Sequence, residues 1–375
     1  MKKIAIVFLT VLMAWPAAAQ TPLKFMVSED VSYDDNIYLT DDNTKDSFIS
    51  STQVGANYKA NVPGSGLELS ATGLVGYNAY TEDSSKNNYW NAFANVDLKN
   101  DMFNVGDNFL YTSDPANSEL TERAERINNT GYISFKTSTE KTLGFGLFAD
   151  DSFDRYFQAE YGDALNRNRV NVGAKLFYNV SPKTSFFAEY MYSDIAYETN
   201  KDNNSTGSTV GLGVEGDITA TVNGIAKVTY AMRDYDNDVA GVNNYNDLFG
   251  YYVALQWQPT DRNTIRLSGE RSMQESMYGS NRYYADTLVS LYGSQKIFDK
   301  WTASLTLGWE NMAYDRYVGN TKRNDDLYTI RPALDYQFKD WLSAGVWYQF
   351  RTRQSNTNPF DYNRNQAGIY AKALF

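Results

Sequence analysis

The last fourteen residues, Tyr362 to Phe375, constrain the fold more than any other stretch of the chain. They read YNRNQAGIYAKALF, and from Gln366 onward every second residue is apolar. The residues between them are mixed and carry the charge of Lys372. Alternation with a period of two places the two sets on opposite faces of a β-strand. The sequence therefore predicts a C-terminal strand with one wholly apolar face, which could also be the edge strand of a soluble sheet.

Residues 1–19 have the features of a secretory signal peptide. Lys2 and Lys3 form a basic start, residues 4–15 are an apolar run, and Ala17 to Ala19 provide a small-residue cleavage site. We expect the mature chain to span residues 20–375 and to be exported. No other stretch approaches the ~18 consecutive apolar residues of a membrane-spanning helix, so none is expected.

The composition excludes several kinds of site. The chain has no cysteine and no histidine, which removes disulfides, histidine bases, His-ligated zinc and Ser-His-Asp triads. We expect no catalytic residues, no cofactor and no metal. The net charge of −11 argues against nucleic acid, whose recognition needs a basic patch.

The mature chain consists of alternating segments that are rich in aromatic residues and separated by turn residues. The 30 Tyr and 20 Phe favour strands, and the many Asn, Asp and Gly favour turns. Short and long connections follow each other in turn, as periplasmic turns and extracellular loops do in transmembrane barrels. The predicted strands are 25–39, 47–58, 67–80, 89–98, 102–111, 129–136, 142–153, 169–178, 184–197, 208–215, 221–233, 248–257, 264–273, 283–295, 301–312, 327–338, 341–353 and 362–375.

About eighteen strands behind a signal peptide predict an all-β fold: a transmembrane, antiparallel, up-and-down β-barrel. A soluble β-sandwich also alternates, but it does not usually sustain the pattern over so many strands. The terminal strand resembles the closing strand of bacterial outer-membrane barrels. That resemblance implies contact with outer-membrane lipid in a Gram-negative bacterium, and recognition of the last strand by the barrel-assembly machinery.

The alternation also predicts which side chains face the bore. In the strand 341–353 the apolar set faces lipid, because an arginine on the lipid side at mid-bilayer costs about 2–4 kcal/mol. About eighteen strands leave an aqueous channel. The inward Trp347 could provide a stacking surface for sugar rings or be an ordinary wall residue. The candidates for lining the lumen are Glu68, Lys175, Glu189, Lys227, Arg266, Glu270, Glu310, Arg331, Asp335, Trp347, Arg351 and Lys372.

The connection 114–126 stands out among the predicted loops. Its core reads SELTERAER and favours a helix, with Glu119–Arg123 and Glu122–Arg126 spaced four residues apart. These four residues are our candidates for a loop that folds into the barrel and narrows it. The alternative is a helical turn at the cell surface. Other acidic pairs, such as Asp325 and Asp326, are expected in solvated loops.

The segment Val31-Ser32-Tyr33-Asp34-Asp35-Asn36-Ile37, together with the length and strand count, resembles the Putative beta-barrel porin 2 family. Members of that family are similar to outer-membrane proteins found with exopolysaccharide and capsule synthesis machinery. The resemblance implies an eighteen-stranded barrel that passes polysaccharide outward, with a periplasmic polysaccharide-export protein as a partner. It supplies no catalytic residues.

Our leading hypothesis is a conduit for an exopolysaccharide or capsular polysaccharide. The first alternative is a general or solute-specific diffusion porin. A barrel enzyme acting on lipid or glycan and a structural or adhesive barrel are further alternatives. Paired carboxylates could hydrolyse glycosides, but no pair stands out among the mixed charges of the lumen.

Overall fold

The alternating segments of the sequence form eighteen β-strands in one sheet. The computed structural model describes residues 23–137, 141–238, 243–278, 281–318 and 321–375. The signal-peptide prediction for residues 1–19 lies outside this part. The strands are β1 (Leu23–Asp34), β2 (Ser47–Val62), β3 (Leu67–Tyr80), β4 (Tyr89–Lys99), β5 (Phe103–Thr112), β6 (Arg126–Lys136), β7 (Leu143–Tyr156), β8 (Arg167–Ser181), β9 (Thr184–Tyr197), β10 (Ser205–Asp217), β11 (Val222–Tyr235), β12 (Tyr245–Thr260), β13 (Asn263–Glu275), β14 (Tyr283–Lys296), β15 (Trp301–Val318), β16 (Thr321–Lys339), β17 (Leu342–Ser355) and β18 (Tyr362–Leu374).

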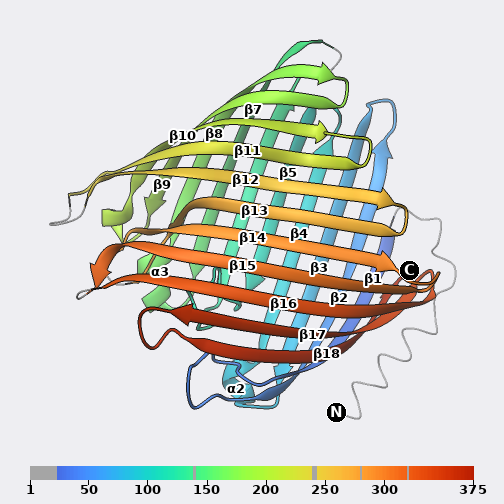
Figure 1. Ribbon diagram of the computed structural model, residues 1–375, viewed down its shortest axis with the longest axis vertical. Helices are drawn as coiled ribbons and strands as arrows, with labels where there is room; N and C mark the ends of the chain where they lie inside the picture. Colours follow the sequence, from blue (N-terminus) through green and yellow to red (C-terminus); the bar gives the residue numbers. More distant parts are fainter. Residues whose placement is uncertain (1–22, 138–140, 239–242, 279–280, 319–320) are drawn as a thin grey trace.

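Every strand pairs antiparallel with its neighbours in sequence, and β18 pairs with β1 to close the sheet. The closing ladder runs from Met26↔Leu374 to Asp34↔Gln366. It is extended by Phe375, whose backbone N–H donates to the Phe25 carbonyl at 2.9 Å. The front strands cross the strands behind them obliquely, as tilted strands of a barrel do (Figure 1). The predicted fold class and the number of strands are confirmed.

The rest of the secondary structure in the described residues is short. It comprises α2 (Ser84–Asn87), α3 (Ala159–Leu165) and the 3-10 turn η1 (Lys201–Asn203), all in connections between strands. None of the helices in the described residues is both long and apolar enough to cross a membrane.

Alternate residues of each strand face outward or into the barrel. Leu176, Leu212 and Ile369 belong to the outward set and expose 69%, 63% and 61% of their surface. Charged residues of the opposite set meet each other across strands that are not neighbours, for example Lys136 of β6 and Glu215 of β10 at 2.6 Å. Side chains can span that separation only through the interior. The outer face is therefore apolar, and the bore is lined by polar groups.

The first strand ends earlier than predicted, at Asp34 rather than at residue 39. The Asp34 carboxylate accepts the backbone N–H of Asn36, and the Asn36 side chain accepts the N–H of Thr40. These side-chain bonds replace the ladder and turn the chain. Arg364 of β18 binds both Asp34 oxygens through Nε at 3.0 Å, which fixes this turn at the closing seam. The segment that carries the family resemblance therefore helps to close the barrel.

The expectation of a solvated loop at Asp325 was wrong. Asp325 lies in β16 and is fully buried. Its carboxylate accepts two hydrogen bonds at 3.0 Å from Nε of Arg323, whose own side chain is 1% exposed. The strand extends this far because the arginine satisfies the acid, a pairing that composition alone does not reveal.

Candidate functional site

The connection between β5 and β6, residues 113–125, crosses the inside of the barrel. The Ser118 hydroxyl donates to Glu310 of β15 at 2.8 Å and accepts from Arg351 of β17 at 3.1 Å. Arg353 of β17 donates to the Ser118 carbonyl. Counted around the closed sheet through β1 and β17, β15 is eight strands away from β5. The largest possible separation between two strands of an eighteen-stranded barrel is nine. Loop 113–125 must therefore reach almost to the opposite wall.

A second anchor holds the loop to another part of the wall. The Glu119 carboxylate accepts the Ser276 hydroxyl at 2.5 Å and the Met277 backbone N–H at 3.1 Å, just after β13. Glu119 is only 7% exposed. Burial raises the pKa of its carboxyl above the ordinary value, although the hydrogen bonds from Ser276 and Met277 act in the opposite direction. The acid is held in place by donors, and no arginine of the described residues lies within ion-pair distance of it.

The end of β3 supplies a third anchor. Arg123 donates to the Tyr80 hydroxyl at 2.6 Å, and its guanidinium lies 4.4 Å from the centre of that ring. Leu120 and Ala124 pack with Tyr156 and with Leu165 of α3. Contacts in several directions therefore hold loop 113–125 inside the barrel.

The loop has no helix, so the helix-favouring prediction for its core was wrong. Glu119 binds Ser276 and Met277, while Arg123 binds Tyr80, so the two do not pair with each other. Glu122 accepts from the Tyr161 hydroxyl at 2.9 Å. Arg126 is the first residue of β6 rather than part of the loop, and it lies 3.9 Å from Asp154. Tertiary partners outweigh the weak pairs of a single helical turn, which contribute about 0.2–0.5 kcal/mol each.

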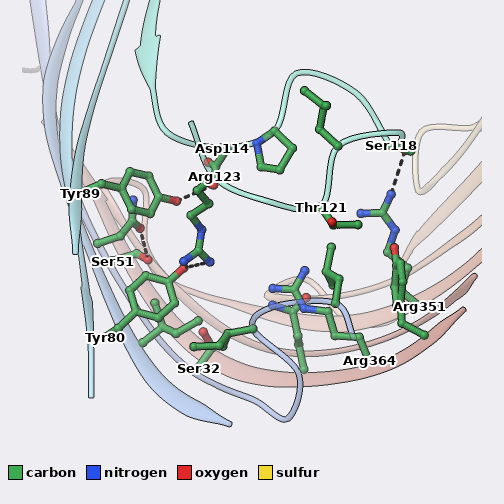
Figure 2. A pocket seen from close by; sticks show the side chains of 18 of the residues that line it. Ser32, Ser51, Tyr80, Tyr89, Asp114, Ser118, Thr121, Arg123, Arg351 and Arg364 are labelled. Atoms are coloured by element: carbon green, nitrogen blue, oxygen red, sulfur yellow. Dashed lines mark hydrogen bonds between the residues drawn. The ribbon is translucent and has the colours of Figure 1, made fainter. Parts of the chain in front are cut away.

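A cavity of about 520 Å³ separates loop 113–125 from the wall formed by β1–β4, β17 and β18. We call it the loop cavity. Figure 2 shows Arg123 and Arg351 approaching it from opposite sides, with Arg364 between them on the wall and the loop passing across. Four arginines, two aspartates, four aromatic residues and several hydrogen-bonding side chains line it: Arg123, Arg351, Arg353, Arg364, Asp30, Asp114, Tyr80, Tyr89, Trp347, Tyr362, Ser32, Ser51, Asn78 and Gln366.

The arginines of the loop cavity differ in their partners. Arg364 is neutralised by Asp34. In the part of the chain that the structure describes, Arg123, Arg351 and Arg353 have no carboxylate within ion-pair distance. Arg353 is 2% exposed, and its Nε and Nη1 have no hydrogen-bond partner there. Three guanidinium groups beside the cavity are therefore without a directly paired carboxylate in the described residues.

The aspartates of the cavity are engaged by aromatic residues instead. Asp30 accepts from Nε1 of Trp347 at 2.8 Å, and Asp114 accepts from the Tyr89 hydroxyl at 2.6 Å. The guanidinium of Arg331 lies 4.8 Å from the Trp347 ring centre. Three candidates for the lumen, Arg331, Trp347 and Arg351, are thus brought together beside the loop.

Three other lumen candidates form a separate ionic cluster on β8, β9 and β11. Glu189 lies 2.6 Å from Lys227 and 3.4 Å from Lys175. Lys175 is also 3.6 Å from Glu215, which binds Lys136. Three lysines and two glutamates thus pair with one another along the wall.

The remaining candidates lie apart. Glu68 pairs with Lys59 at 2.9 Å beside the turn between β2 and β3. Arg266 donates to Gln256 at 2.9 Å. The strand register places three further candidates on the inward face, through the pairs Tyr252↔Glu270, Thr302↔Asp335 and Ser343↔Lys372.

Sequence reasoning left Tyr80, Tyr89, Arg353 and Arg364 out of the candidate set. Alternation places Arg353 on the same face as Arg351, and Arg364 on the same face as Gln366. The inward orientation of both arginines was therefore predictable from the sequence. No local pattern indicates that the 113–125 loop reaches them. Across the described residues, no group of three or more acidic side chains is arranged to hold a metal ion.

Comparison with known proteins agrees with this geometry. The chain has 9% identity with the crystal structure of the outer membrane protein OpdK from Pseudomonas aeruginosa, with 94% of this chain and 99% of that chain covered and a TM-score of 0.52. For OpdK with vanillate the identity is 10%, the coverage 94% and 99%, and the TM-score 0.52. OccAB4 from Acinetobacter baumannii gives 11% identity, coverage of 95% and 99%, and a TM-score of 0.50. At these identities the likeness shows the fold alone.

No curated protein matches the chain. Residues 23–374 match the family model described as Putative beta-barrel porin 2, which covers nearly all of the barrel. Porins are channels rather than enzymes, and the apolar outer face suits the outer membrane of a Gram-negative bacterium. The chain therefore belongs to the Putative beta-barrel porin 2 family, as an outer-membrane β-barrel of the porin type.

Proposed function

We propose that this barrel is a selective channel for carbohydrate, and that it carries an exopolysaccharide or capsular polysaccharide across the outer membrane. The single observation that carries the proposal is the position of loop 113–125, fixed across the bore beside a cavity with both aromatic and hydrogen-bonding walls. Aromatic faces pack on the apolar faces of sugar rings, and Ser, Asn and Gln side chains exchange hydrogen bonds with sugar hydroxyls.

A polymer would pass the loop cavity one sugar unit at a time. Selection would come from the width left beside the loop and from the charges of the wall, as in other channels. The family resemblance also implies a periplasmic polysaccharide-export protein as a partner. The turn after β2 spans only residues 63–66, so that partner would dock on short turns at the periplasmic rim.

The second candidate is a diffusion porin for a small solute. The anchoring of loop 113–125 favours it, because a loop tied at Ser118, Glu119 and Arg123 leaves little room for a bulky chain. The cavity also falls within the ~300–1,000 Å³ of small-molecule sites. OpdK, which shares this fold, has been crystallised with vanillate.

Deleting the gene in its own bacterium separates the two candidates. Loss of secreted polysaccharide, with unchanged uptake of small solutes, is expected for export. Unchanged polysaccharide with slower uptake of a small solute would favour the porin instead. Complementation with the full-length gene controls for effects on neighbouring genes. In parallel, vesicles containing the purified barrel should release trapped neutral sugar oligomers faster than empty vesicles do.

A further inference from the structure

We propose that the loop cavity binds a negatively charged sugar, with the carboxylate of a uronic acid unit held among Arg123, Arg351 and Arg353. This inference rests on the proposed carbohydrate channel and adds the class of its substrate. Two features carry it: the arginines without a carboxylate partner in the described residues, and the aromatic and hydroxyl-bearing wall that surrounds them.

Arg353 is the first step of the argument. It is 2% exposed, its Nη2 donates to the Ser118 carbonyl, and its guanidinium lies 5.0 Å from the Tyr362 ring centre. Its Nε and Nη1 remain without a partner in the described chain. Buried charges are ordinarily paired, because an uncompensated charge is costly to remove from water. An anion in the loop cavity would supply the missing counter-charge.

Arg351 and Arg123 extend the positive site. Arg351 gives one hydrogen bond to the Ser118 hydroxyl, and its buried Nε has no partner in the described residues. Arg123 donates to the Tyr80 hydroxyl and lies over the rings of Tyr80 and Tyr89. The two approach the cavity from opposite sides (Figure 2). Planar guanidinium groups bind carboxylates through two parallel hydrogen bonds, which suits them to this ligand.

The neighbouring carboxylates are not paired with these arginines. Asp30 accepts from Trp347 and Asp114 from Tyr89, while Glu310 accepts the Ser118 hydroxyl, so each is bound by a neutral donor and keeps its charge. Guanidinium groups that could bind a carboxylate therefore lie beside acceptors that could receive hydrogen bonds from sugar hydroxyls.

The walls distinguish a sugar from a simple anion. Tyr80, Tyr89 and Trp347 present rings to the cavity, and Ser32 and Asn78 present polar groups. A bare inorganic anion would use only the arginines. A uronic acid unit would use both kinds of wall, which is why we assign the cavity to a charged sugar.

The test measures block of ion current through the full-length barrel in a planar bilayer. The probes are a tetramer of glucuronic acid, a neutral glucose tetramer, benzoate and phosphate, each at an ionic strength of about 0.1 M. The acidic tetramer should block at about tenfold lower concentration than the neutral one, since hydrogen bonds to charged groups are the stronger ones. Benzoate and phosphate should block more weakly than the acidic tetramer.

Arg351→Gln and Arg123→Gln should each lower the preference for the acidic over the neutral tetramer about tenfold. Both residues also hold loop 113–125, so the two tetramers are compared within each variant. Arg353→Gln should act in the same direction. Should its loss of the Ser118 contact prevent folding, the other two variants still decide. Arg262→Gln is the matched control, because Arg262 lies in the turn after β12 and is 57% exposed. This control variant should change block by neither the acidic nor the neutral tetramer.

Equal block by the acidic and neutral tetramers, or no effect of Arg351→Gln and Arg123→Gln, would overturn the anionic site. The channel proposal would survive that result if neutral oligomers still cross vesicle membranes through the barrel. Block by benzoate or phosphate as strong as that by the acidic tetramer would overturn the assignment to a sugar. If no oligomer crosses the membrane, the carbohydrate channel itself fails.

Discussion

Replacing Glu119 with alanine should release loop 113–125 from the wall. The substitution removes the acceptor for the Ser276 hydroxyl at 2.5 Å and for the Met277 N–H at 3.1 Å. Hydrogen bonds to charged groups contribute about 1.5–3 kcal/mol each. The net contribution is smaller than the sum of the two bonds. Both donors bind water when the loop undocks, and the carboxylate loses hydration when the loop docks. We therefore expect a net loss of about 2–3 kcal/mol of docking free energy, which raises the undocked fraction roughly 30- to 150-fold.

A thiol reporter in the loop measures this fraction. The chain has no cysteine, so Ala124→Cys introduces a single reactive site. Ala124 is 2% exposed and packs against Leu120, Tyr156 and Leu165, so a maleimide reaches it only when the loop undocks. Adding Glu119→Ala should speed labelling by about the same roughly 30- to 150-fold factor.

The matched control is Glu122→Ala in the same reporter background. Glu122 belongs to the same loop, but its hydrogen bond from the Tyr161 hydroxyl lies at an exposed position. Its loss should change the labelling rate by less than about threefold, since exposed pairs are weak. Equal labelling rates for Glu119→Ala and Glu122→Ala, in barrels that fold alike, would refute the reasoning.

Three further predictions follow from the lumen, the last residue and the loop acid. Glu189→Gln leaves Lys175 and Lys227 without their shared partner; it should lower the free energy of unfolding by about 1–3 kcal/mol and shift the reversal potential in a salt gradient toward anion selectivity. An unchanged reversal potential would contradict this. Phe375→Ala removes the terminal side chain that the assembly machinery is expected to recognise but keeps the backbone bonds to β1. It should therefore reduce assembly in cells and leave refolding in micelles unchanged, whereas an equal loss in both would indicate a stability defect only. The docked loop raises the pKa of Glu119, so docking binds a proton. Docking of the loop is strongest at a pH below the ordinary pKa of a glutamate, and it weakens as the pH rises through the raised pKa of Glu119. Labelling at position 124, normalised to free cysteine, should increase over that window, and Glu119→Gln should remove the trend; the opposite slope would contradict the assignment.

The sequence was sufficient for the strands, because each strand of a barrel repeats one simple constraint. Every second side chain must be apolar to face lipid, so the pattern in residues 366–375 predicts both the strand and its facing. The same rule places Arg351 and Trp347 on the inward face. Strand ends were less predictable. The end of β1 at Asp34 and the extension of β16 beyond Asp325 depend on contacts with Arg364 and Arg323.

Contacts between distant parts of the chain could not be predicted from local pattern. Residues 118–123 favour a helix by their spacing, but their partners lie on β3, β15, β17 and after β13. Glu29 gives a second example, since it occupies an outward position in β1. Its carboxylate accepts the hydroxyls of Ser50 and Thr52 at 2.5 Å, a compensation that depends on the register with β2.

The most direct test of the account is the single-channel conductance of the barrel with and without residues 117–125. Joining the flanking residues with a short Gly-Ser linker removes the anchors at Ser118, Glu119 and Arg123 and leaves all eighteen strands intact. Circular dichroism of the purified variant checks that the sheet is retained. If loop 113–125 is the narrowest point of the bore, conductance should rise severalfold. An unchanged conductance in a correctly folded variant would show that the loop does not control passage.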